Sequence, residues 1–190
     1  MGLERLSLLR PHEEALPYHV KEVMESISKS KVVMKPLLVE AKTNIILDGM
    51  HRYEALRLIG AELAPVVKVD YSKVELVGWA RVYEYREDML SVLLQLSKSY
   101  RVKGRSAVVF LADESSYYDI KKLEEEGLRL IKVVTRPAMI DGSIVVVPPL
   151  PTKDLVKSAA ETGNLLPARS TRHITIAKRI YLPTPLKELL

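Results

Sequence analysis

The segment from Leu47 to Leu56 constrains the fold of this chain most, because its residues predict a strand, a tight turn and a helix in direct succession. The apolar run from Asn44 to Leu47 is typical of a short strand. Apolar residues then recur at helical spacing from His51 to Ile59, and Gly60 follows where glycine commonly ends a helix. The chain must therefore turn sharply between a strand and a helix.

The turn itself, Asp48-Gly49, is followed by His51 and Arg52 in the first helical turn, and this arrangement has two interpretations. A helix start exposes unpaired backbone N–H groups and the positive end of the helix dipole, so cationic side chains there favour an anion such as phosphate. Asp and Gly are also an ordinary turn pair, and a His-Arg pair at a helix start is often only solvated. The turn alone leaves both interpretations open.

Composition limits the partners of such a site. A chain of 190 residues, 47% hydrophobic and 28% charged, is expected to be globular and can form one substantial domain or two small lobes. Its net charge of +5 and pI near 9.3 suit a phosphate-bearing partner. Because the Lys and Arg residues are scattered, a small anionic ligand is favoured over a nucleic acid.

The absence of cysteine excludes a disulfide framework, thiolate metal ligands and a thiol nucleophile. No apolar run reaches the roughly 20 residues of a membrane-spanning helix, and Met1 to Arg5 lacks the apolar stretch of a signal peptide. We therefore expect a cytoplasmic protein without a membrane partner, as a monomer or a small homo-oligomer.

The order of elements predicts a mixed α/β fold with two lobes. Residues 1–72 predict an α/β core, residues 73–150 a smaller α/β lobe, and residues 151–190 a helix and a segment that returns to the site. The prolines from Pro148 to Pro151 mark the second boundary. The predicted strands are Arg5 to Leu9, Leu37 to Ala41, Asn44 to Leu47, Pro65 to Tyr71, Val74 to Trp79, Ala107 to Leu111, Leu128 to Val134 and Ile144 to Val147. Besides His51 to Ile59, the predicted helices are Val20 to Ile27, Asp88 to Lys98, Tyr117 to Glu126 and a helix from Thr152 to Thr162.

Near the C-terminus, Pro167 to His173 collects two arginines, two hydroxyl side chains and a histidine. These donors can clamp a phosphate or a carboxylate, whereas an exposed basic loop is the alternative interpretation. His12, His51 and His173 lie in three separate polar loops that could converge on one pocket. Each histidine taken alone is better explained as an ordinary hydrogen-bonded residue.

The common signatures of P-loop, dinucleotide-binding, zinc-protease and esterase proteins are all absent from the chain. Phosphoryl transfer stays possible, because it asks for a carboxylate near the acceptor, cationic groups on the moving phosphoryl group and Mg²⁺ on the phosphate oxygens. Glu13, Asp48, His51 and Arg52 supply the protein side chains for that chemistry.

The residues Asp48-Gly49-Met50-His51-Arg52 resemble the Asp-Gly-x-His-Arg helix start of the ParB N-terminal and sulfiredoxin superfamily, whose members bind nucleotide phosphates at this turn. The likeness covers about the first 70 residues. Two further motifs make the chain most similar to the archaeal free L-serine kinases of that superfamily. They are Lys/Arg-Pro-His-Glu, here Arg10 to Glu13, and Thr-Arg-His, here Thr171 to His173.

This resemblance implies transfer of a phosphoryl group from ADP or ATP to the hydroxyl of free L-serine, which gives O-phospho-L-serine for cysteine biosynthesis. By the same likeness, Glu13 is the base that takes the serine hydroxyl proton. Asp48 either holds Mg²⁺ or orients the acceptor, and the sequence does not choose between these roles.

The resemblance also implies the binding residues. The phosphates are expected at Gly49, Met50, His51 and Arg52, and the serine carboxylate and product phosphate at His12, Ser170, Thr171, Arg172 and His173. Trp79, the only tryptophan, either lines the serine pocket or belongs to the core. Glu124 to Glu126 is typical of a solvated helix face.

Some residues depart from the family pattern. Met50 replaces the first histidine of Asp-Gly-His-His-Arg, so a polar role for this position is in doubt, and the lack of cysteine excludes sulfiredoxin chemistry. The alternatives within the same fold are a nucleotide-responsive DNA-binding regulator and a Mg²⁺-dependent nuclease. The β-rich middle offers no clear recognition helix, which disfavours a role in chromosome partition.

Overall fold

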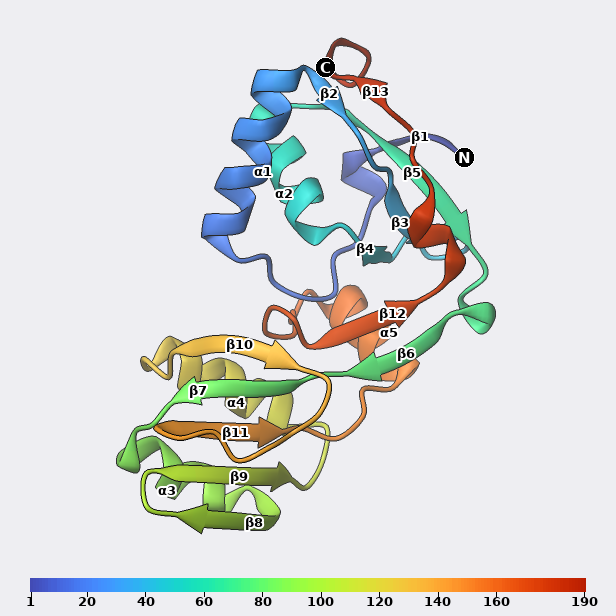
Figure 1. The fold of residues 1–190 in the computed structure, drawn as a ribbon. Coiled ribbons are helices and arrows are strands. Elements are labelled where there is room, and N and C mark those ends of the chain that lie inside the picture. The colour runs from blue at the N-terminus through green and yellow to red at the C-terminus, as the bar shows by residue number, and fades with distance from the viewer. The chain divides into compact units, whose positions relative to one another are not determined.

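The computed structural model describes residues 1–190, which divide into two compact units (Figure 1). The first unit contains Met1–Glu75, Val156–Ala168 and His173–Leu190, and the second contains Leu76–Leu155 and Arg169–Arg172. Residues 151–190 are therefore divided between both units. None of the helices combines the length and apolar character that a membrane span requires.

The first unit contains a four-stranded sheet in the order β1-β5-β3-β4. Its strands are β1 (Gly2–Arg5), β3 (Leu37–Glu40), β4 (Ile46–Asp48) and β5 (Leu63–Val69). β3 pairs in parallel with β5, and the other neighbours are antiparallel, so the sheet is mixed and β3 and β4 form a hairpin.

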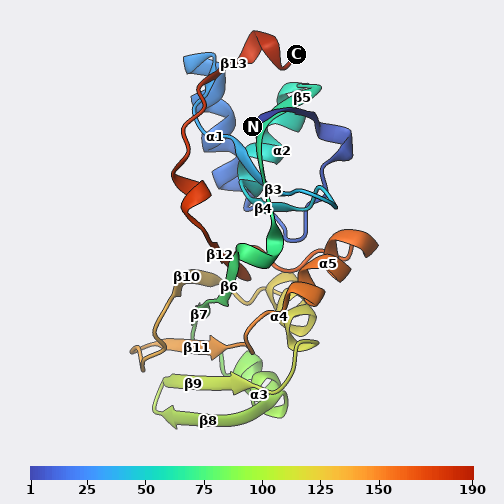
Figure 2. The same cartoon turned by 90° about the vertical axis from the view of Figure 1, so that its right-hand side faces the viewer.

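Two helices, α1 (Pro17–Ser30) and α2 (Met50–Ile59), lie side by side next to this sheet (Figures 1 and 2). Val20 and Ile27 of α1, Leu56 of α2 and Val39 of β3 share one apolar core, as their spacing predicts. The shorter elements of this unit are β2 (Val32–Val33), β13 (Thr184–Pro185) and the 3₁₀ turns η1 (Leu6–Leu8), η2 (Tyr71–Lys73), η3 (Ile176–Arg179) and η4 (Leu186–Glu188).

The predicted strand from Arg5 to Leu9 is wrong beyond its first residue, because η1 begins at Leu6. Leu6 and Leu9 are both buried and stand three residues apart, which is the spacing at which a 3₁₀ turn places two side chains on one face. A strand would have directed these two leucines to opposite faces.

The second unit contains a five-stranded sheet in the order β10-β7-β11-β9-β8, with β9 parallel to β11. Its strands are β7 (Ala80–Glu84), β8 (Ser97–Lys103), β9 (Ser106–Leu111), β10 (Leu130–Val134) and β11 (Ser143–Val147). The helices α3 (Glu87–Gln95) and α4 (Ser116–Glu125) pack on it through Leu93 and Ile120. Three elements run from one unit into the other along the chain: β6 (Glu75–Gly78), α5 (Lys153–Thr162) and β12 (Thr171–Ile174).

Two strands of the second sheet were not predicted. β8 is an exposed edge strand that carries Lys98, Arg101 and Lys103, so it lacks the apolar pattern that identifies a strand. β7 contains a charged residue, Arg81, that is nevertheless fully buried. The solvated face predicted for Glu124 is also wrong, because this carboxylate forms an ion pair with Arg81.

Candidate functional site

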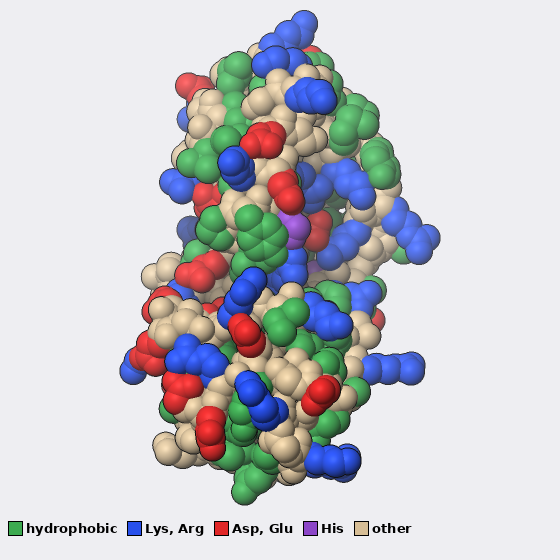
Figure 3. Space-filling view, turned by 60° about the vertical axis from the view of Figure 1, so that its left-hand side comes forward, with side chains coloured by type: hydrophobic (Ala, Val, Ile, Leu, Met, Phe, Trp, Pro, Cys, Tyr) green, Lys and Arg blue, Asp and Glu red, His purple; other side chains and the backbone are tan.

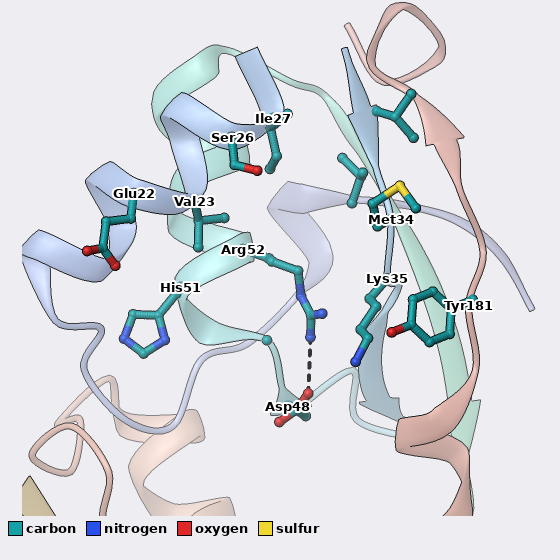
Figure 4. Close-up of a pocket in the computed structure, with 13 residues that line it drawn as sticks. Glu22, Val23, Ser26, Ile27, Met34, Lys35, Asp48, His51, Arg52 and Tyr181 are labelled. Atoms are coloured by element: carbon teal, nitrogen blue, oxygen red, sulfur yellow. Dashed lines mark hydrogen bonds and ion pairs between the residues drawn. The ribbon is translucent and has the colours of Figure 1, made fainter. Parts of the chain in front are cut away.

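A cavity of about 670 Å³ opens in the first unit beside the start of α2 (Figure 4). Its polar residues include Asp48, His51 and Arg52, and apolar side chains such as Val23 and Ile27 of α1 form another part of its wall. This volume lies in the range of pockets that hold small molecules and cofactors. In the upper half of Figure 3, a histidine is visible among Lys and Arg side chains.

Asp48 lies between two cations at the end of β4. Its Oδ2 atom is 3.0 Å from Nη2 of Arg52, and its Oδ1 atom is 3.0 Å from Nζ of Lys178. Figure 4 shows Arg52 pointing from α2 toward Asp48, between His51 on one side and Lys35 on the other. Both oxygens of this half-exposed carboxylate are therefore neutralised by neighbouring side chains.

Arg52 does not use all of its donors. Its Nε atom is buried and has no hydrogen-bond partner. Burial lowers the pKa of Arg52, and the neighbouring Asp48 carboxylate opposes that shift. A guanidinium with an unused buried donor is suited to an additional anionic partner, because leaving such a donor unsatisfied costs free energy.

Gly49 makes the turn possible. Its φ is +103°, a left-handed conformation that disfavours side chains. A Cβ atom at this position would stand 2.6 Å from Cδ2 of Leu37 and 2.8 Å from Nη2 of Arg52. Glycine therefore lets the Arg52 guanidinium lie directly against the turn.

The start of α2 has no side-chain cap. The first backbone bond of the helix runs from Tyr53 N to Gly49 O at 2.9 Å, so the preceding N–H groups of residues 50–52 belong to the open helix end. The side chain of Met50 is buried in the apolar core of this unit. Met50 can therefore contribute only its backbone N–H group to an anion at this helix start.

His51 is held by the loop before α1. Its Nε2 atom accepts a hydrogen bond from Leu16 N at 3.1 Å, and its ring lies edge-on to His19 with centroids 5.3 Å apart. Since Nε2 acts as an acceptor, the neutral ring carries its proton on Nδ1. His51 thus lines the cavity in a fixed orientation.

His12 and His173 meet in the interior of the first unit, each 1% exposed, with ring centroids 5.4 Å apart. His12 Nδ1 donates to Ile46 O at 2.8 Å, and burial lowers the pKa of His12 to about 4. His173 Nε2 lies 2.9 Å from the Tyr71 hydroxyl, whose pKa burial raises. Two of the three predicted histidine loops therefore converge, on a buried cluster and not on an open surface.

Glu13 stands beside this cluster, with Oε2 at 3.8 Å from His12 Nε2. Backbone bonds from Leu166 N to His12 O and from Glu14 N to Leu166 O, both 2.9 Å, hold the loop that carries it. Glu13 also lines a second cavity of the first unit, of about 580 Å³. It is partly exposed, so a ligand can reach its carboxylate.

The other predicted binding residues belong to the second unit. Trp79 is half-buried, and the Arg172 guanidinium lies 4.9 Å from the centre of its ring. Ser170 and Thr171 are both buried. The alternative interpretation of this segment as an exposed basic loop is therefore wrong for its two hydroxyl side chains.

Three residues near Asp48 were not predicted: Lys35, Lys178 and Tyr181. Lys35 and Lys178 line a small cavity of about 210 Å³ next to Asp48 and Arg52, and Lys35 Nζ lies 4.8 Å from the centre of the Tyr181 ring. The one local signal is Thr175, which caps the turn that carries Lys178 by accepting a hydrogen bond from Ala177 N at 3.3 Å. Nothing in the sequence places this turn beside Asp48.

No cluster of three or more His, Cys, Asp or Glu side chains could hold a metal ion by itself. Mg²⁺ in nucleotide sites is bound by one or two carboxylates together with substrate phosphates. Asp48 lines both cavities, but its two oxygens already contact Arg52 and Lys178, so it would hold Mg²⁺ only by exchanging one of these contacts.

No protein-family model matches the sequence. A ParB-like protein of Sulfolobus acidocaldarius is 32% identical over 187 residues, which cover 92% of this chain and 89% of the relative. The ADP-dependent L-serine kinase SerK of Thermococcus kodakarensis is 26% identical over 219 residues, covering 97% of this chain and 90% of the relative. Among solved structures, a variant of free serine kinase in complex with ADP superposes with a TM-score of 0.72 at 19% identity, covering 99% of this chain and 93% of that one. This last likeness establishes the fold.

Proposed function

This chain belongs to the ParB-like protein family, and from that premise we propose that it is a kinase that phosphorylates the hydroxyl of free L-serine. The observation that carries the proposal is the uncapped start of α2, where Arg52 keeps a buried donor unused beside a cavity of about 670 Å³. A diphosphate or triphosphate supplies the anion that such a helix end favours.

The nucleotide binds with its phosphates at the turn. Gly49 lets the Arg52 guanidinium lie against the turn and supply positive charge, and the backbone N–H groups of Met50 and His51 donate to the phosphate. The apolar wall at Val23 and Ile27 suits the flat face of the base. Mg²⁺, when bound, neutralises phosphate charge, and Asp48 is the carboxylate that would hold it.

Serine is activated by Glu13. The carboxylate takes the proton of the serine hydroxyl while the serine oxygen bonds to the terminal phosphorus, and AMP leaves from ADP, or ADP from ATP. His12 has its Nδ1 atom engaged by Ile46 O, so it presents Nε2 toward Glu13 and steadies the base.

The segment from Ser170 to Arg172, with Trp79, binds the carboxylate of serine and the product phosphate. Arg172 is the cation of this set, and its position over the Trp79 ring holds both side chains together. His173 is buried against Tyr71 and His12, so its contribution is to support Glu13 through His12.

The direct test is incubation of the purified protein with Mg²⁺, L-serine and either ADP or ATP, followed by detection of O-phospho-L-serine. We expect product with at least one donor. The absence of product with both donors would contradict the proposal. Omission of Mg²⁺ tests the metal, and the rates with the two nucleotides identify the donor.

Glu13→Gln tests the base. General-base catalysis contributes roughly 10²–10⁴-fold, so turnover should fall by about that factor while nucleotide binding stays measurable. Glu14→Gln is the matched control, since it removes the neighbouring carboxylate of the same loop. Full activity in Glu13→Gln would refute the assignment of Glu13 without refuting the kinase.

A nucleotide-responsive DNA-binding regulator or a Mg²⁺-dependent nuclease is the second candidate, favoured only by the ParB-like name of one relative. A regulator would bind duplex DNA with an affinity that falls steeply with salt, and a nuclease would release nucleotides from DNA. We propose instead a cytoplasmic enzyme, a monomer or small homo-oligomer, whose product feeds cysteine biosynthesis. Size-exclusion chromatography measures the oligomeric state.

A further inference from the structure

Arg81 in β7 is fully buried, and each part of its guanidinium has a partner within the second unit. Nε donates to the Tyr83 hydroxyl at 2.6 Å, Nη2 to Glu124 Oε1 at 2.7 Å, and Nη1 to the backbone carbonyl of Arg169 at 3.1 Å. We call these four residues the Arg81 network.

Within this network, Arg81, Tyr83 and Glu124 are all hydrogen-bonded to one another. Burial raises the pKa of Tyr83, so its hydroxyl stays protonated and donates to Glu124 Oε1 at 2.6 Å. Burial disfavours the charged form of Arg81, but Tyr83 and Glu124 outweigh it and hold the pKa of Arg81 above its ordinary value. The charge is therefore compensated without any help from Arg169.

The third donor of Arg81, Nη1, bonds to the backbone of Arg169, in a segment near the C-terminus. Arg169–Arg172 is the only stretch after Leu155 that belongs to the second unit, and the residues before and after it belong to the first. Arg169 has a φ of +59°, a left-handed conformation that is uncommon for a residue with a side chain. The bond from Arg81 thus holds a short returning segment at its strained first residue.

This segment carries the side chains that the proposed function assigns to substrate. Ser170 and Thr171 follow Arg169 directly and are buried, and Arg172 lies over the Trp79 ring. A shift of the Arg169 carbonyl would move all of them together, because they are consecutive in the chain. Enzyme rates respond strongly to such displacements of binding groups.

We propose that Arg81 is a positioning residue for the serine-binding segment, acting through the Arg169 carbonyl on Thr171 and Arg172. The proposal rests on the proposed function. It assigns a role to a buried charge that the kinase chemistry itself does not use.

The test is Arg81→Lys, which keeps a positive charge for Glu124 but cannot reach three acceptors at once. We expect the KM for serine to rise by about 3- to 10-fold, the range for loss of one ordinary hydrogen bond, with the KM for the nucleotide unchanged. Arg86→Lys is the matched control. Arg86 also joins a carboxylate, Asp88, to a backbone carbonyl, that of Gly127, at a place that holds no proposed substrate residue.

The double variant Arg81→Met/Glu124→Met keeps the test usable if Arg81→Lys folds poorly, because a buried ion pair replaced as a whole by apolar residues is often tolerated. It should raise the serine KM in the same selective way. An unchanged serine KM in both variants, or an equal rise in both KM values, would overturn the proposal.

Hydrogen exchange separates this inference from the kinase assignment. Amides of residues 169–172 should exchange faster in Arg81→Lys than in the wild-type protein, whether or not the protein makes phosphoserine. Unchanged exchange there would refute the positioning role. Absence of phosphoserine from the wild-type protein would refute the proposed function alone.

Discussion

The two units each contain an arginine paired with a carboxylate, and the pairs differ in how many donors they use. In the first unit, Arg52 is 3.0 Å from Asp48, its side chain is 19% exposed and that of Asp48 is 40% exposed. Its Nε atom has no partner. In the second unit, Arg81 is 2.7 Å from Glu124, is fully buried and uses Nε, Nη1 and Nη2.

The difference lies in how far the protein itself supplies hydrogen-bond partners for each guanidinium. A buried charge is tolerated when every donor is satisfied, and Arg81 meets that condition from within its own unit. Arg52 does not, and its carboxylate is shared with Lys178. A phosphate of the proposed nucleotide would supply the partner that Arg52 Nε lacks.

We call Arg81–Glu124, whose arginine uses all three nitrogens, the closed pair, and Arg52–Asp48 the open pair. The largest expected effect is the loss of stability when the closed pair is broken. Arg81→Met removes the cation of Glu124 and the donor to the Tyr83 hydroxyl and the Arg169 carbonyl, so the free energy of unfolding should fall by roughly 3 kcal/mol, the lower end of the range for breaking a buried pair, because Glu124 is 22% exposed. Arg52→Met should cost under about 1 kcal/mol, as for partly exposed ion pairs, while weakening nucleotide binding. Urea denaturation and nucleotide titration measure the two quantities. Equal losses of stability in both variants would break the comparison.

The next largest effect is a dependence of stability on pH, which we expect from the buried His12 of the first unit. His12 has a pKa of 6.5 when unfolded and about 4 when folded, so between these values the unfolded chain binds a proton that the folded chain does not. Stability is then fully present above pH 6.5 and declines as the pH falls toward 4, by about 3 kcal/mol in total from this residue.

His12→Asn should flatten this part of the stability profile, measured by denaturation at several pH values from 7 to 4. His19→Asn, in the same unit, is the control, because His19 is at the surface, where it pairs with Glu22. If both variants lost stability in acid as steeply as the wild-type protein, His12 would not be the buried neutral group described here.

The sequence predicts the open pair better than the closed one, and the reason is local. Asp48, Gly49 and Arg52 stand within five residues, so strand, turn and helix signals bring them together without any tertiary knowledge. Arg81 and Glu124 are 43 residues apart. Each matches the pattern of a surface residue, and only the packing of α4 on the sheet makes them partners.

The same limit explains what was missed around the candidate site. Lys178 reaches Asp48 from the far end of the chain, and buried His173 is bonded to Tyr71, which no motif marks. The motif positions themselves were predictable, whereas the division of Ser170 to His173 between two units was not. Periodicity identifies elements, but it does not fix which side chains meet.

A smaller effect comes from the turn that keeps Arg52 in place. Alanine in a left-handed conformation costs roughly 1–2 kcal/mol at either Gly49 or Gly60, whose φ values are +103° and +85°. Only at Gly49 would the new Cβ atom approach Leu37 and Arg52 closely. Gly49→Ala should therefore be the less stable variant and the one that loses nucleotide affinity. A normal nucleotide affinity in Gly49→Ala would argue against a phosphate at this turn.

The smallest expected effect is a loss of stability in Lys178→Met that depends on salt, unlike the loss in Arg81→Met. Lys178 and Asp48 are 31% and 40% exposed, so Lys178→Met should change the free energy of unfolding by no more than about 1 kcal/mol. That change should vanish near 1 M salt, where the screening length is about 3 Å, while the loss caused by Arg81→Met should persist because Arg81 itself is fully buried. Arg179→Met, one residue further in the same turn, controls for the turn itself. A salt-independent loss in Lys178→Met would mean that Asp48 is as closed as Glu124, and the distinction between an open and a closed arginine pair would then no longer hold.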